Sequence, residues 1–349
     1  MQTIMILCGG ESGEHEVSLQ SANSIIKFIP KDRYQTIAVG ISKTGEWLTG
    51  DLLFENEDDP SKICLSNNLI PAKFENKQLN GQPVDVVFPI IHGTYGEDGC
   101  IQGLLQLQHI PYVGSGVLGS SVGMDKDIMK RLFLHEGLNC AKHMVIYSWQ
   151  KTKPTYNEVK AELGAILFVK PCNLGSSVGI SKVTKEDEYR AAIDLALNYD
   201  NKILVEECIK GREIEISVLG NEVTEVSLPG EIIPESGFYS YDAKYIDSET
   251  TRLEIPAKLE KEIIDEIGSI AKTSFRLLEL SGLARVDFFV EDDTKIWINE
   301  VNTLPGFTNI SMYPKLWSAC GVNYSDLIHR LIQLAIERSI REEALIRNR

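Results

Sequence analysis

The stretch Arg285–Gly306, RVDFFVEDDTKIWINEVNTLPG, decides the fold of this chain. It contains two strand-like runs that flank a short polar turn, so it predicts a β-hairpin. Side chains along a strand alternate between its two faces, and a hairpin closed at the polar turn places Asp287 opposite Glu300 and Arg285 opposite Asn302. Like charges that face each other across two strands destabilise a sheet. A cation between the two carboxylates would remove that repulsion.

The side chains around this predicted pairing form an all-oxygen set of two carboxylates and one amide carbonyl. Such hard ligands suit Mg²⁺ better than zinc, and Mg²⁺ bound in this way keeps positions open for phosphate oxygens. The segment therefore predicts a magnesium site formed by Asp287, Glu300 and Asn302. The simpler alternative is a solvated acidic strand face on which Arg285 is a surface ion-pair partner.

The composition is that of a globular protein, and the length of 349 residues predicts two or three domains. The net charge of −15 argues against a nucleic-acid partner, which would need a basic surface. No apolar run approaches the length of a membrane span, and the N-terminal MQTIMILCGG predicts a buried strand rather than a secretory signal. Seven dispersed cysteines without a C-x-x-C motif predict buried free thiols in a reducing compartment.

Three regions of different character follow one another along the chain. Residues 1–122 have the alternating strands and helices of an α/β, βαβ-type domain, residues 123–211 have an α+β pattern, and residues 212–349 contain the hairpin. Residues 50–82 are polar and give no clear assignment. The expected strands are 3–8, 84–91, 110–113, 166–170, 178–183, 203–208 and 213–219, and the expected helices are 16–28, 101–109, 126–136, 156–162, 186–197 and one from about 323.

The hexapeptide LGSSVG occurs twice, at 118–123 and 174–179, and each copy matches the G-x-S-x-G pattern of a hydrolase nucleophile elbow. That elbow needs a strand before the serine and a helix directly after it. Ser177 is followed by a strand-like run instead. A helix does follow Ser121, but no Asp and His pair is evident downstream, so a serine hydrolase is disfavoured.

A second misleading motif is G-x-G-x-x-G at 114–119, which matches the dinucleotide-binding fingerprint. The acidic residue expected about twenty positions later, at the end of a strand, would be Glu136, which falls in a predicted helix. A nicotinamide oxidoreductase is therefore a remote alternative, which a comparison of thermal stabilisation by ATP and by NADH would test. The chain contains no Gly-Lys dipeptide and hence no Walker A loop.

Two lysines and two glutamates are the best candidates for nucleotide contacts. Lys170 ends an apolar strand directly before the glycine-serine run 172–179, whose backbone N–H groups could close over phosphates. Lys126 stands at the start of a helix and is a second candidate. In LVEECIKGRE, Glu206 and Glu213 could accept hydrogen bonds from an adenine amino group and a ribose.

Two further loops have compositions typical of ligand-binding segments. HGTYGEDGCIQG, at 92–103, is a glycine-punctuated loop that runs into a helix. We expect His92 to belong to a site, and Glu97 and Asp98 to cap the helix. FYSYDAKY, at 238–245, lies in a long loop, and long loops in compact domains are often lids.

These segments occur in the order used by the ATP-grasp carboxylate–amine ligases. HGTYGEDGCIQG and GLARVDFFV…IWINEVNTLPG closely resemble the two signature stretches of the D-alanine–D-alanine ligases, and GGESGEHEVSL, KPCNLGSSVG and FYSYDAKY also look like that family. The resemblance spans nearly the whole chain. It implies a three-domain ATP-grasp fold with ATP held between the central and C-terminal domains. A homodimer is also expected.

The resemblance also implies roles for individual residues. Two Mg²⁺ ions, for which Mn²⁺ could substitute, would be held by Asp287, Glu300 and Asn302. The ATP phosphates would be contacted by Lys126, Lys170 and Lys244, and the nucleoside by Glu206 and Glu213. The ammonium of the first D-alanine would pair with Glu14, which would form one hydrogen-bonded set with Ser176 and Tyr245. The remaining roles are oxyanion stabilisation for Arg285 and the Gly306 amide, and substrate binding for His92, Ser311 and Met312.

The implied reaction has two steps. The carboxylate of the first D-alanine attacks the γ-phosphate of ATP, and the amine of the second then displaces phosphate from the acyl phosphate. The dipeptide would be a peptidoglycan precursor in a bacterium, and the resemblance thus implies that the reducing compartment is the cytoplasm. Relatives that make D-Ala–D-Ser or D-Ala–D-lactate are the nearest alternatives; lactate-using relatives usually have a histidine where this chain has Tyr245. One departure is Asn309, where some members have histidine, so any role of that histidine is not transferred.

Overall fold

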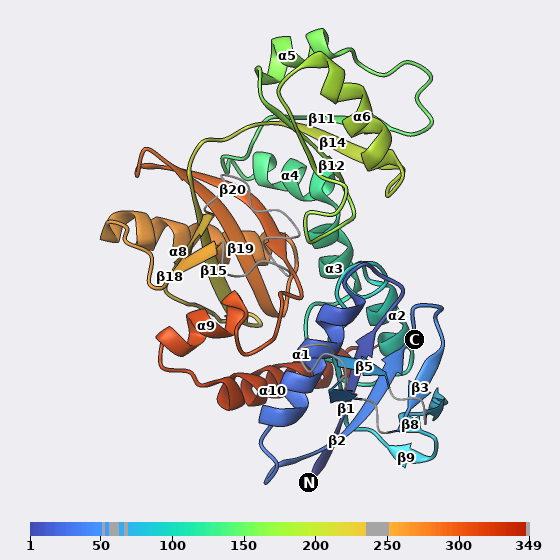
Figure 1. The fold of residues 1–349 in the computed structure, drawn as a ribbon. Coiled ribbons are helices and arrows are strands. Elements are labelled where there is room, and N and C mark those ends of the chain that lie inside the picture. Colours follow the sequence, from blue (N-terminus) through green and yellow to red (C-terminus); the bar gives the residue numbers. More distant parts are fainter. Residues whose placement is uncertain (51–52, 56–62, 66–68, 235–250, 347–349) are drawn as a thin grey trace.

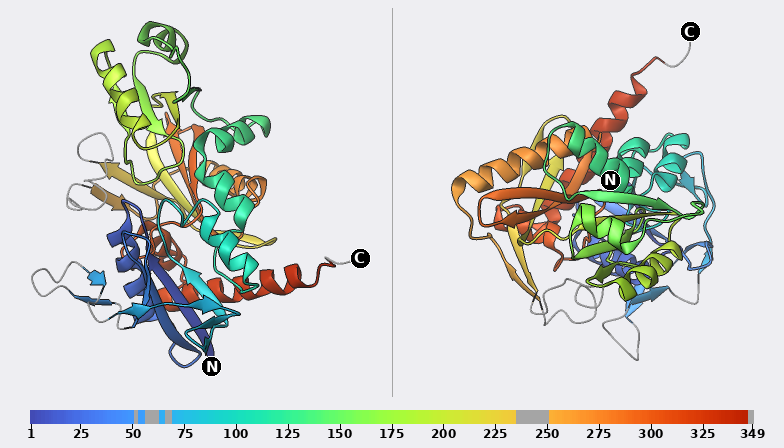
Figure 2. Two further views of the ribbon diagram at one scale, coloured as in Figure 1. Left: turned by 90° about the vertical axis from the view of Figure 1, so that its right-hand side faces the viewer. Right: turned by 90° about the horizontal axis from the view of Figure 1, so that it is seen from above.

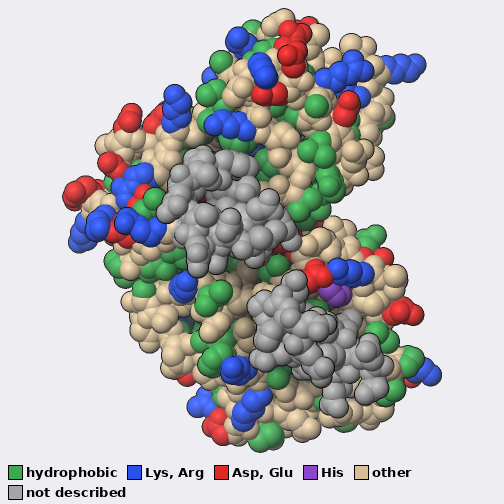
Figure 3. Space-filling view, in the orientation of Figure 1, with side chains coloured by type: hydrophobic (Ala, Val, Ile, Leu, Met, Phe, Trp, Pro, Cys, Tyr) green, Lys and Arg blue, Asp and Glu red, His purple; other side chains and the backbone are tan. Residues whose placement is uncertain are grey.

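The computed structural model describes residues 1–50, 53–55, 63–65, 69–234 and 251–346. The polypeptide forms three stacked parts that follow one another along the chain (Figure 1). In the described residues, no helix is long and apolar enough to cross a bilayer. Acidic and basic side chains are interspersed over the face shown in Figure 3.

The N-terminal part is built on a five-stranded sheet in the order β10-β1-β2-β3-β6. Its centre is parallel, with Ile4 of β1 aligned with both Val86 of β10 and Thr36 of β2. Because β1 is covered on both faces, it is an almost continuous apolar run, as buried parallel strands usually are. The elements are β1 (Gln2–Gly9), α1 (His15–Phe28), β2 (Tyr34–Ile41), β3 (Trp47–Thr49), β6 (Ile70–Pro71), β10 (Val86–Pro89) and α2 (Cys100–Leu107).

Short strands occupy part of the region that gave no clear assignment from sequence. They form a two-stranded sheet of β4 (Leu53–Glu55) and β5 (Ile63–Leu65), and a three-stranded sheet of β7 (Phe74–Glu75), β8 (Gln78–Leu79) and β9 (Gln82–Pro83). The strand predicted at 110–113 was wrong, because only Tyr112 forms a single bridge, to Val87.

Two helices in succession connect the N-terminal part to the next one (Figure 1). They are α3 (Val117–Met124) and α4 (Lys126–His135), separated by Asp125. The Asp125 side chain accepts hydrogen bonds from the backbone N–H groups of Asp127 and Ile128, which is a standard way to begin a helix. Lys202 pairs with the same carboxylate at 2.6 Å and so ties the start of α4 to the central sheet.

The central part is a four-stranded antiparallel sheet in the order β11-β14-β12-β13. Two helices cover one of its faces and share an apolar core with it. The elements are β11 (His143–Tyr147), α5 (Tyr156–Leu163), β12 (Leu167–Pro171), β13 (Ser181–Val183), α6 (Glu186–Leu197) and β14 (Lys202–Glu207).

The C-terminal part is a six-stranded sheet in the order β18-β17-β15-β19-β20, with β16 paired to β15. Helix α8 covers one face, where alternate apolar residues of β15 and β19 are buried. The elements are β15 (Arg212–Gly220), β16 (Thr224–Val226), β17 (Gly230–Pro234), β18 (Thr251–Glu254), α8 (Lys261–Leu277), β19 (Gly282–Glu291), β20 (Lys295–Asn302), α9 (Met312–Ala319) and α10 (Tyr324–Glu343).

The last helix returns to the first sheet. Leu327 and Leu331 of α10 share one apolar core with Ile4 and Phe88 of the N-terminal strands, and the views in Figures 1 and 2 agree that α10 lies beside that part. The central sheet has a core of its own. The division at 122/123 and 211/212 stays a prediction.

Candidate active site

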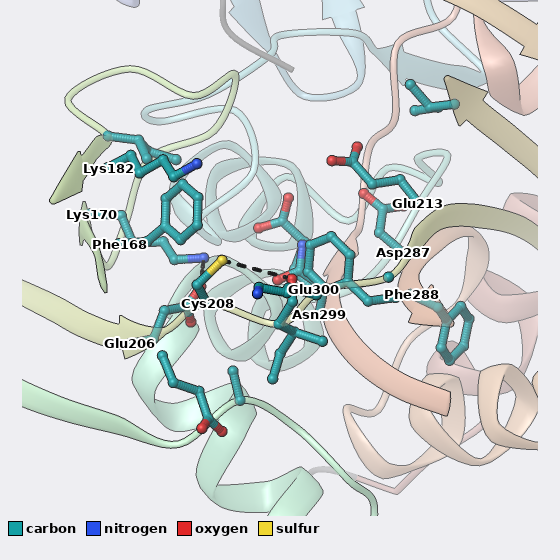
Figure 4. Close-up of a pocket in the computed structure, with 18 of the residues that line it drawn as sticks. Phe168, Lys170, Lys182, Glu206, Cys208, Glu213, Asp287, Phe288, Asn299 and Glu300 are labelled. Atoms are coloured by element: carbon teal, nitrogen blue, oxygen red, sulfur yellow. Dashed lines mark hydrogen bonds and ion pairs between the residues drawn. The ribbon is translucent and has the colours of Figure 1, made fainter. Parts of the chain in front are cut away.

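A cleft of about 340 Å³ lies between the central and C-terminal sheets. Figure 4 shows Lys170 and Glu206 on one side of it and Glu213 and Asp287 on the other. The first pair comes from β12 and β14, the second from β15 and β19. Four residues that the sequence singled out for nucleotide or metal contacts are therefore gathered around one cavity, together with Glu300.

The alternation of residues along β15 produces the C-terminal wall of this cleft. Ile216 and Val218 are buried against the core under α8, whereas Glu213 and Glu215 line the cleft. In an antiparallel sheet with one face packed on a core and the other open, apolar and polar residues alternate along each strand in this way. The sheet is therefore a rigid support for charged side chains on its open face.

The predicted hairpin register is confirmed. Asp287 is aligned with Glu300 and Arg285 with Asn302. The register shifts between Asp287 and Phe288, and Phe288 is aligned with Ile298, so Asn299 is the extra residue of a β-bulge. Asn299 lines the cleft. Bulges commonly re-aim side chains near functional sites, and sequence alternation alone gave no sign of this one.

Arg285 holds the acidic side chains of this face together. It donates to both oxygens of Asp287 at 2.7 Å, and its Nε lies 3.0 Å from Glu215 Oε2. Asn302 donates to Asp287 Oδ2 at 3.0 Å. Only 18% of the Arg285 side chain and 13% of the Asp287 side chain are exposed. The alternative of a solvated acidic face is therefore wrong for these two side chains.

The neighbouring carboxylates stabilise the charge of Arg285. Burial lowers the pKa of Arg285, but Asp287 and Glu215 outweigh it, so that this pKa lies well above the ordinary value. Glu215 is a third carboxylate on adjacent strands, in register with Asp287. Only the pairing of β15 with β19 reveals it, because the two residues are far apart in sequence.

The donor set fits Mg²⁺ that shares its coordination with a substrate. Asp287, Glu300 and Asn302 supply oxygen atoms from one end of the hairpin. Over the described part of the chain, no group of three or more His, Cys, Asp or Glu side chains is arranged to hold a metal ion. Two carboxylates completed by phosphate oxygens and water are the usual protein ligands of Mg²⁺ in nucleotide sites.

Lys126 joins the hairpin to the glycine-serine loop. Its Nζ donates to the Leu174 carbonyl at 2.8 Å and lies 3.3 Å from Glu300 Oε2. Its backbone N–H donates to the Cys172 carbonyl at 3.0 Å. Burial lowers the pKa of Lys126, but Glu300 more than offsets this and raises it above the ordinary value. Lys126 is therefore a buried cation beside the proposed metal ligands.

The glycine-serine loop reaches the N-terminal part at Glu14. Ser176 Oγ donates to Glu14 Oε1, and Ser176 and Ser177 both have left-handed backbones, with φ of 52° and 60°. Such conformations are uncommon for residues other than glycine and cluster at functional sites. The structure thus brings together Glu14 and Ser176, which are 162 residues apart, as the resemblance implied.

Glycine is required where Glu14 is approached from a second segment. Gly93 has φ of +78°, and a Cβ there would lie 2.8 Å from Glu14 Oε2. Its neighbour His92 accepts a hydrogen bond at its carbonyl from Ser12 Oγ at 2.8 Å. Two distant segments therefore converge on the carboxylate of Glu14.

His92 is buried, with contacts on both ring nitrogens. Nδ1 lies 3.4 Å from Glu97 Oε1 and 3.2 Å from the Leu304 carbonyl, and Nε2 is 3.1 Å from Ser21 Oγ. Burial lowers the pKa of His92, but Glu97 outweighs it, and the pKa lies above the ordinary value. Burial raises the pKa of Glu97.

The predicted capping role was right for one of the two acids. Asp98 accepts from the backbone N–H of Cys100, the first residue of α2, and from that of Tyr95. For Glu97 the capping interpretation was wrong, because this side chain is directed inward to His92. Sequence spacing could not distinguish them, since both precede the helix.

Gly306, Ser311 and Met312 lie around the start of α9. Ser311 Oγ accepts from the Thr308 N–H at 3.1 Å, and a Cβ on Gly306 would lie 3.3 Å from the same Oγ. The Met312 side chain is buried with Ile232 and Leu316. Lys244 and Tyr245 lie outside the described residues.

The first LGSSVG copy is a packing element. Ser121 lies within α3 and donates to the Asp98 carbonyl at 2.7 Å and the Val117 carbonyl at 2.9 Å. A Cβ on Gly119 would come within 2.5 Å of the Glu279 carbonyl oxygen. The residue expected to end a strand in a dinucleotide fold, Glu136, terminates α4 instead.

Comparisons with known proteins agree with these features. The model "D-ala D-ala ligase N-terminus" matches residues 3–115, and "D-ala D-ala ligase C-terminus" matches residues 132–333. A D-alanine–D-alanine ligase from Oceanobacillus iheyensis is 50% identical, with 97% of this chain and 96% of the relative covered.

Solved structures give the same result. A D-alanine–D-alanine ligase from Coxiella burnetii has a TM-score of 0.85 and 36% identity, with 99% of this chain and 98% of that one covered. A D-Ala:D-Ser ligase from Enterococcus faecalis has a TM-score of 0.81 and 34% identity over 96% and 99% of the chains. A Bacillus anthracis D-alanine–D-alanine ligase complexed with ATP has a TM-score of 0.77 and 26% identity over 98% and 100%.

The two sheets with a charged cleft between them are those of an ATP-grasp ligase. The chain belongs to the D-alanine–D-alanine ligase family, because the two family models together cover most of it and close relatives align over almost its full length.

Proposed function

We propose that this enzyme joins two D-alanine molecules to D-alanyl-D-alanine, with conversion of ATP to ADP and phosphate. The observation that carries the proposal is the cleft in which Lys170 and Glu206 face Asp287 and Glu300. It offers cations for phosphates, acceptors for a nucleoside and oxygen ligands for Mg²⁺ around one cavity. The relatives' names and the ATP complex of one structural neighbour support the same activity.

ATP would be held from both sheets. Lys126 and Lys170 would contact its phosphates, together with Lys244, and Glu206 and Glu213 would accept hydrogen bonds from the nucleoside. Lys170 is paired with Glu206, so it would exchange that partner for a phosphate. Point charges of this kind are suited to phosphate binding.

Two Mg²⁺ ions, or Mn²⁺ in their place, would be held by Asp287, Glu300 and Asn302. When bound, they would neutralise charge on the transferring phosphoryl group. Arg285 would remain beside them, since its pairing with Glu215 leaves it anchored even while Asp287 serves as a ligand.

The first D-alanine would be oriented by Glu14, with its ammonium on the carboxylate that Ser176 now contacts, and Tyr245 would complete this set. Its carboxylate oxygen attacks the γ-phosphorus, the bond to ADP breaks, and D-alanyl phosphate forms. His92, Ser311 and the Met312 N–H would bind the second D-alanine. Its amine attacks the acyl carbon and expels phosphate, while Arg285 and the Gly306 N–H stabilise the oxyanion.

The second substrate is proposed to be D-alanine rather than D-serine or D-lactate. Tyr245 stays neutral near pH 7, whereas a histidine at such a position could be cationic and disfavour an ammonium-bearing nucleophile. One structural neighbour is a D-Ala:D-Ser ligase, so the choice needs a direct test. A cytoplasmic homodimer that supplies a peptidoglycan precursor is the setting we propose.

The test is phosphate release from ATP and Mg²⁺ with D-alanine, with L-alanine as control, followed by chromatography of the products. D-Alanyl-D-alanine is expected only with the D-isomer, and it is expected to predominate when D-serine and D-lactate are supplied equally. Predominance of a mixed product would overturn the second-substrate assignment, and no phosphate release with any D-amino acid would overturn the activity.

A further inference from the structure

Glu206 has a separate lysine on each carboxylate oxygen. Lys170 Nζ contacts Oε1, and Lys130 Nζ lies 3.1 Å from Oε2. All three side chains are buried: Lys130 is 0%, Glu206 4% and Lys170 7% exposed. Lysine is almost never fully buried without a charged partner, so the depth of Lys130 calls for an explanation.

The two lysines approach Glu206 from different places. Lys170 comes from β12 and lines the cleft with Glu206. Lys130 comes from α4, and among the described residues around the cleft it is not a lining residue. Lys170 is therefore within reach of a ligand, whereas Lys130 is a fixed partner behind the carboxylate.

This arrangement matters when a nucleotide enters. In the proposed function, Lys170 leaves Glu206 for the phosphates. A buried carboxylate that lost its single cation would be strongly destabilised, and it would take up a proton instead. Burial raises the pKa of Glu206, but Lys130 and then Lys170 outweigh this effect, and the pKa lies below its ordinary value. Lys130 can thus keep the carboxylate charged after Lys170 has moved.

We propose that Lys130 is a positioning residue that holds Glu206 as an ionised hydrogen-bond acceptor and thereby makes the site select a 6-amino purine over a 6-oxo purine. An ionised carboxylate accepts only, so it can bind the amino group at C6 of adenine and is repelled by a carbonyl oxygen there. A protonated carboxyl could donate to that oxygen, and the selectivity would fall. The inference rests on the proposed role of Glu206 at the nucleobase.

Other titratable groups also face this carboxylate, and none replaces Lys130. His143 of β11 is in register with Glu206 across the sheet, and burial together with Lys130 lowers the pKa of this histidine. Burial raises the pKa of the Cys140 and Cys208 thiols. Lys126 is already paired with Glu300. Lys182 and Lys210 line the same cleft, but the cations that lower the pKa of Glu206 are Lys130 and Lys170.

The test compares ATP with inosine triphosphate, which differ in the purine by the amino or oxo group at C6 and by the hydrogen that the oxo form carries on N1. The N1 difference is the same for every variant, so a change in the nucleotide preference between variants reports on the contact at C6. The ratio of kcat/KM for the two nucleotides and their calorimetric affinities are measured for the wild type, Lys130→Met and Lys130→Arg. Lys130→Met keeps the length of the chain without its charge, and Lys130→Arg keeps the charge. We expect the preference for ATP to fall at least about tenfold in Lys130→Met and to be largely retained in Lys130→Arg.

A purely structural lysine would give a different result. Equal losses with ATP and inosine triphosphate in Lys130→Met, at an unchanged ratio, would overturn the inference. If Lys130→Met does not fold, Lys130→Gln is measured in the same way. Failure of the proposed function would be recognised separately, because the wild type would then bind neither nucleotide or form no dipeptide from D-alanine and ATP.

Discussion

Gly119→Ala tests the packing of α3, the helix that leads from the N-terminal part to the cleft. The Cβ of alanine would lie 2.5 Å from the carbonyl oxygen of Glu279 and 3.1 Å from Leu280 Cδ2. Glu279 already has a left-handed backbone, with φ of 55°, and it cannot shift without disturbing its own turn. Overpacking of this kind costs about 1–3 kcal/mol.

A gain in helix propensity opposes that cost. Alanine in place of glycine inside a helix stabilises by about 0.5–1 kcal/mol, so the net loss in the free energy of unfolding should lie between about 0 and 2.5 kcal/mol, with a midpoint of about 1 kcal/mol. Gly103→Ala is the matched control, because Gly103 lies inside α2 and its nearest neighbour to a new Cβ is Val117 Cγ2 at 3.9 Å. This control should be stabilised by about 0.5–1 kcal/mol.

The assay is urea unfolding of both variants and the wild type, followed by circular dichroism and tryptophan fluorescence. The two alanine variants should move in opposite directions. Stabilisation of Gly119→Ala to the same extent as Gly103→Ala would refute the close-packing explanation of the first LGSSVG copy.

Three further predictions concern the site. Glu300→Gln should leave the protein folded, although with a lower unfolding temperature because the buried Lys126 loses its anionic partner, and should weaken Mn²⁺ binding, measured by electron paramagnetic resonance, by about tenfold or more; unaltered Mn²⁺ affinity would exclude Glu300 as a ligand. Lys170→Ala should weaken ATP binding by about 1.5–3 kcal/mol in calorimetry without a matching loss for D-alanine, and equal losses would contradict a phosphate role. The folded protein holds the proton of His92 more tightly than the unfolded chain does because, although burial lowers the pKa of His92, Glu97 outweighs this effect. This contribution to stability is therefore fully present below the ordinary pKa of histidine and is lost as pH rises through the raised pKa, so Glu97→Gln should flatten the dependence of unfolding free energy on pH above about 6; parallel curves for variant and wild type would contradict this.

The hairpin was predictable because its information is local. Alternation in RVDFFV and IWINEVN, with a polar turn between them, determined which carboxylates face each other. The contact between Glu14 and Ser176 was predictable for another reason, since it came from the resemblance and not from spacing. The residues alone offered no link across 162 positions.

The roles that could not be predicted from the sequence depend on residues that are distant in sequence and become neighbours only in the folded chain. Glu215 belongs to the acidic face only because β15 pairs with β19. In the sequence, Lys130 cannot be distinguished from other lysines in helices. Only the packing of α4 against β14 shows that it pairs with Glu206. The direction of Glu97 depends on the buried ring of His92. In each case a distant partner decides the role of the side chain.

The most direct measurement of the central claim follows oxygen from substrate to phosphate. D-Alanine labelled with ¹⁸O in its carboxylate is incubated with ATP, Mg²⁺ and the enzyme, and the released phosphate is analysed by mass spectrometry. If D-alanyl phosphate forms and is cleaved by the second amine, one labelled oxygen enters phosphate for each dipeptide made. Dipeptide formation with unlabelled phosphate would contradict an acyl phosphate pathway in the cleft between the two sheets.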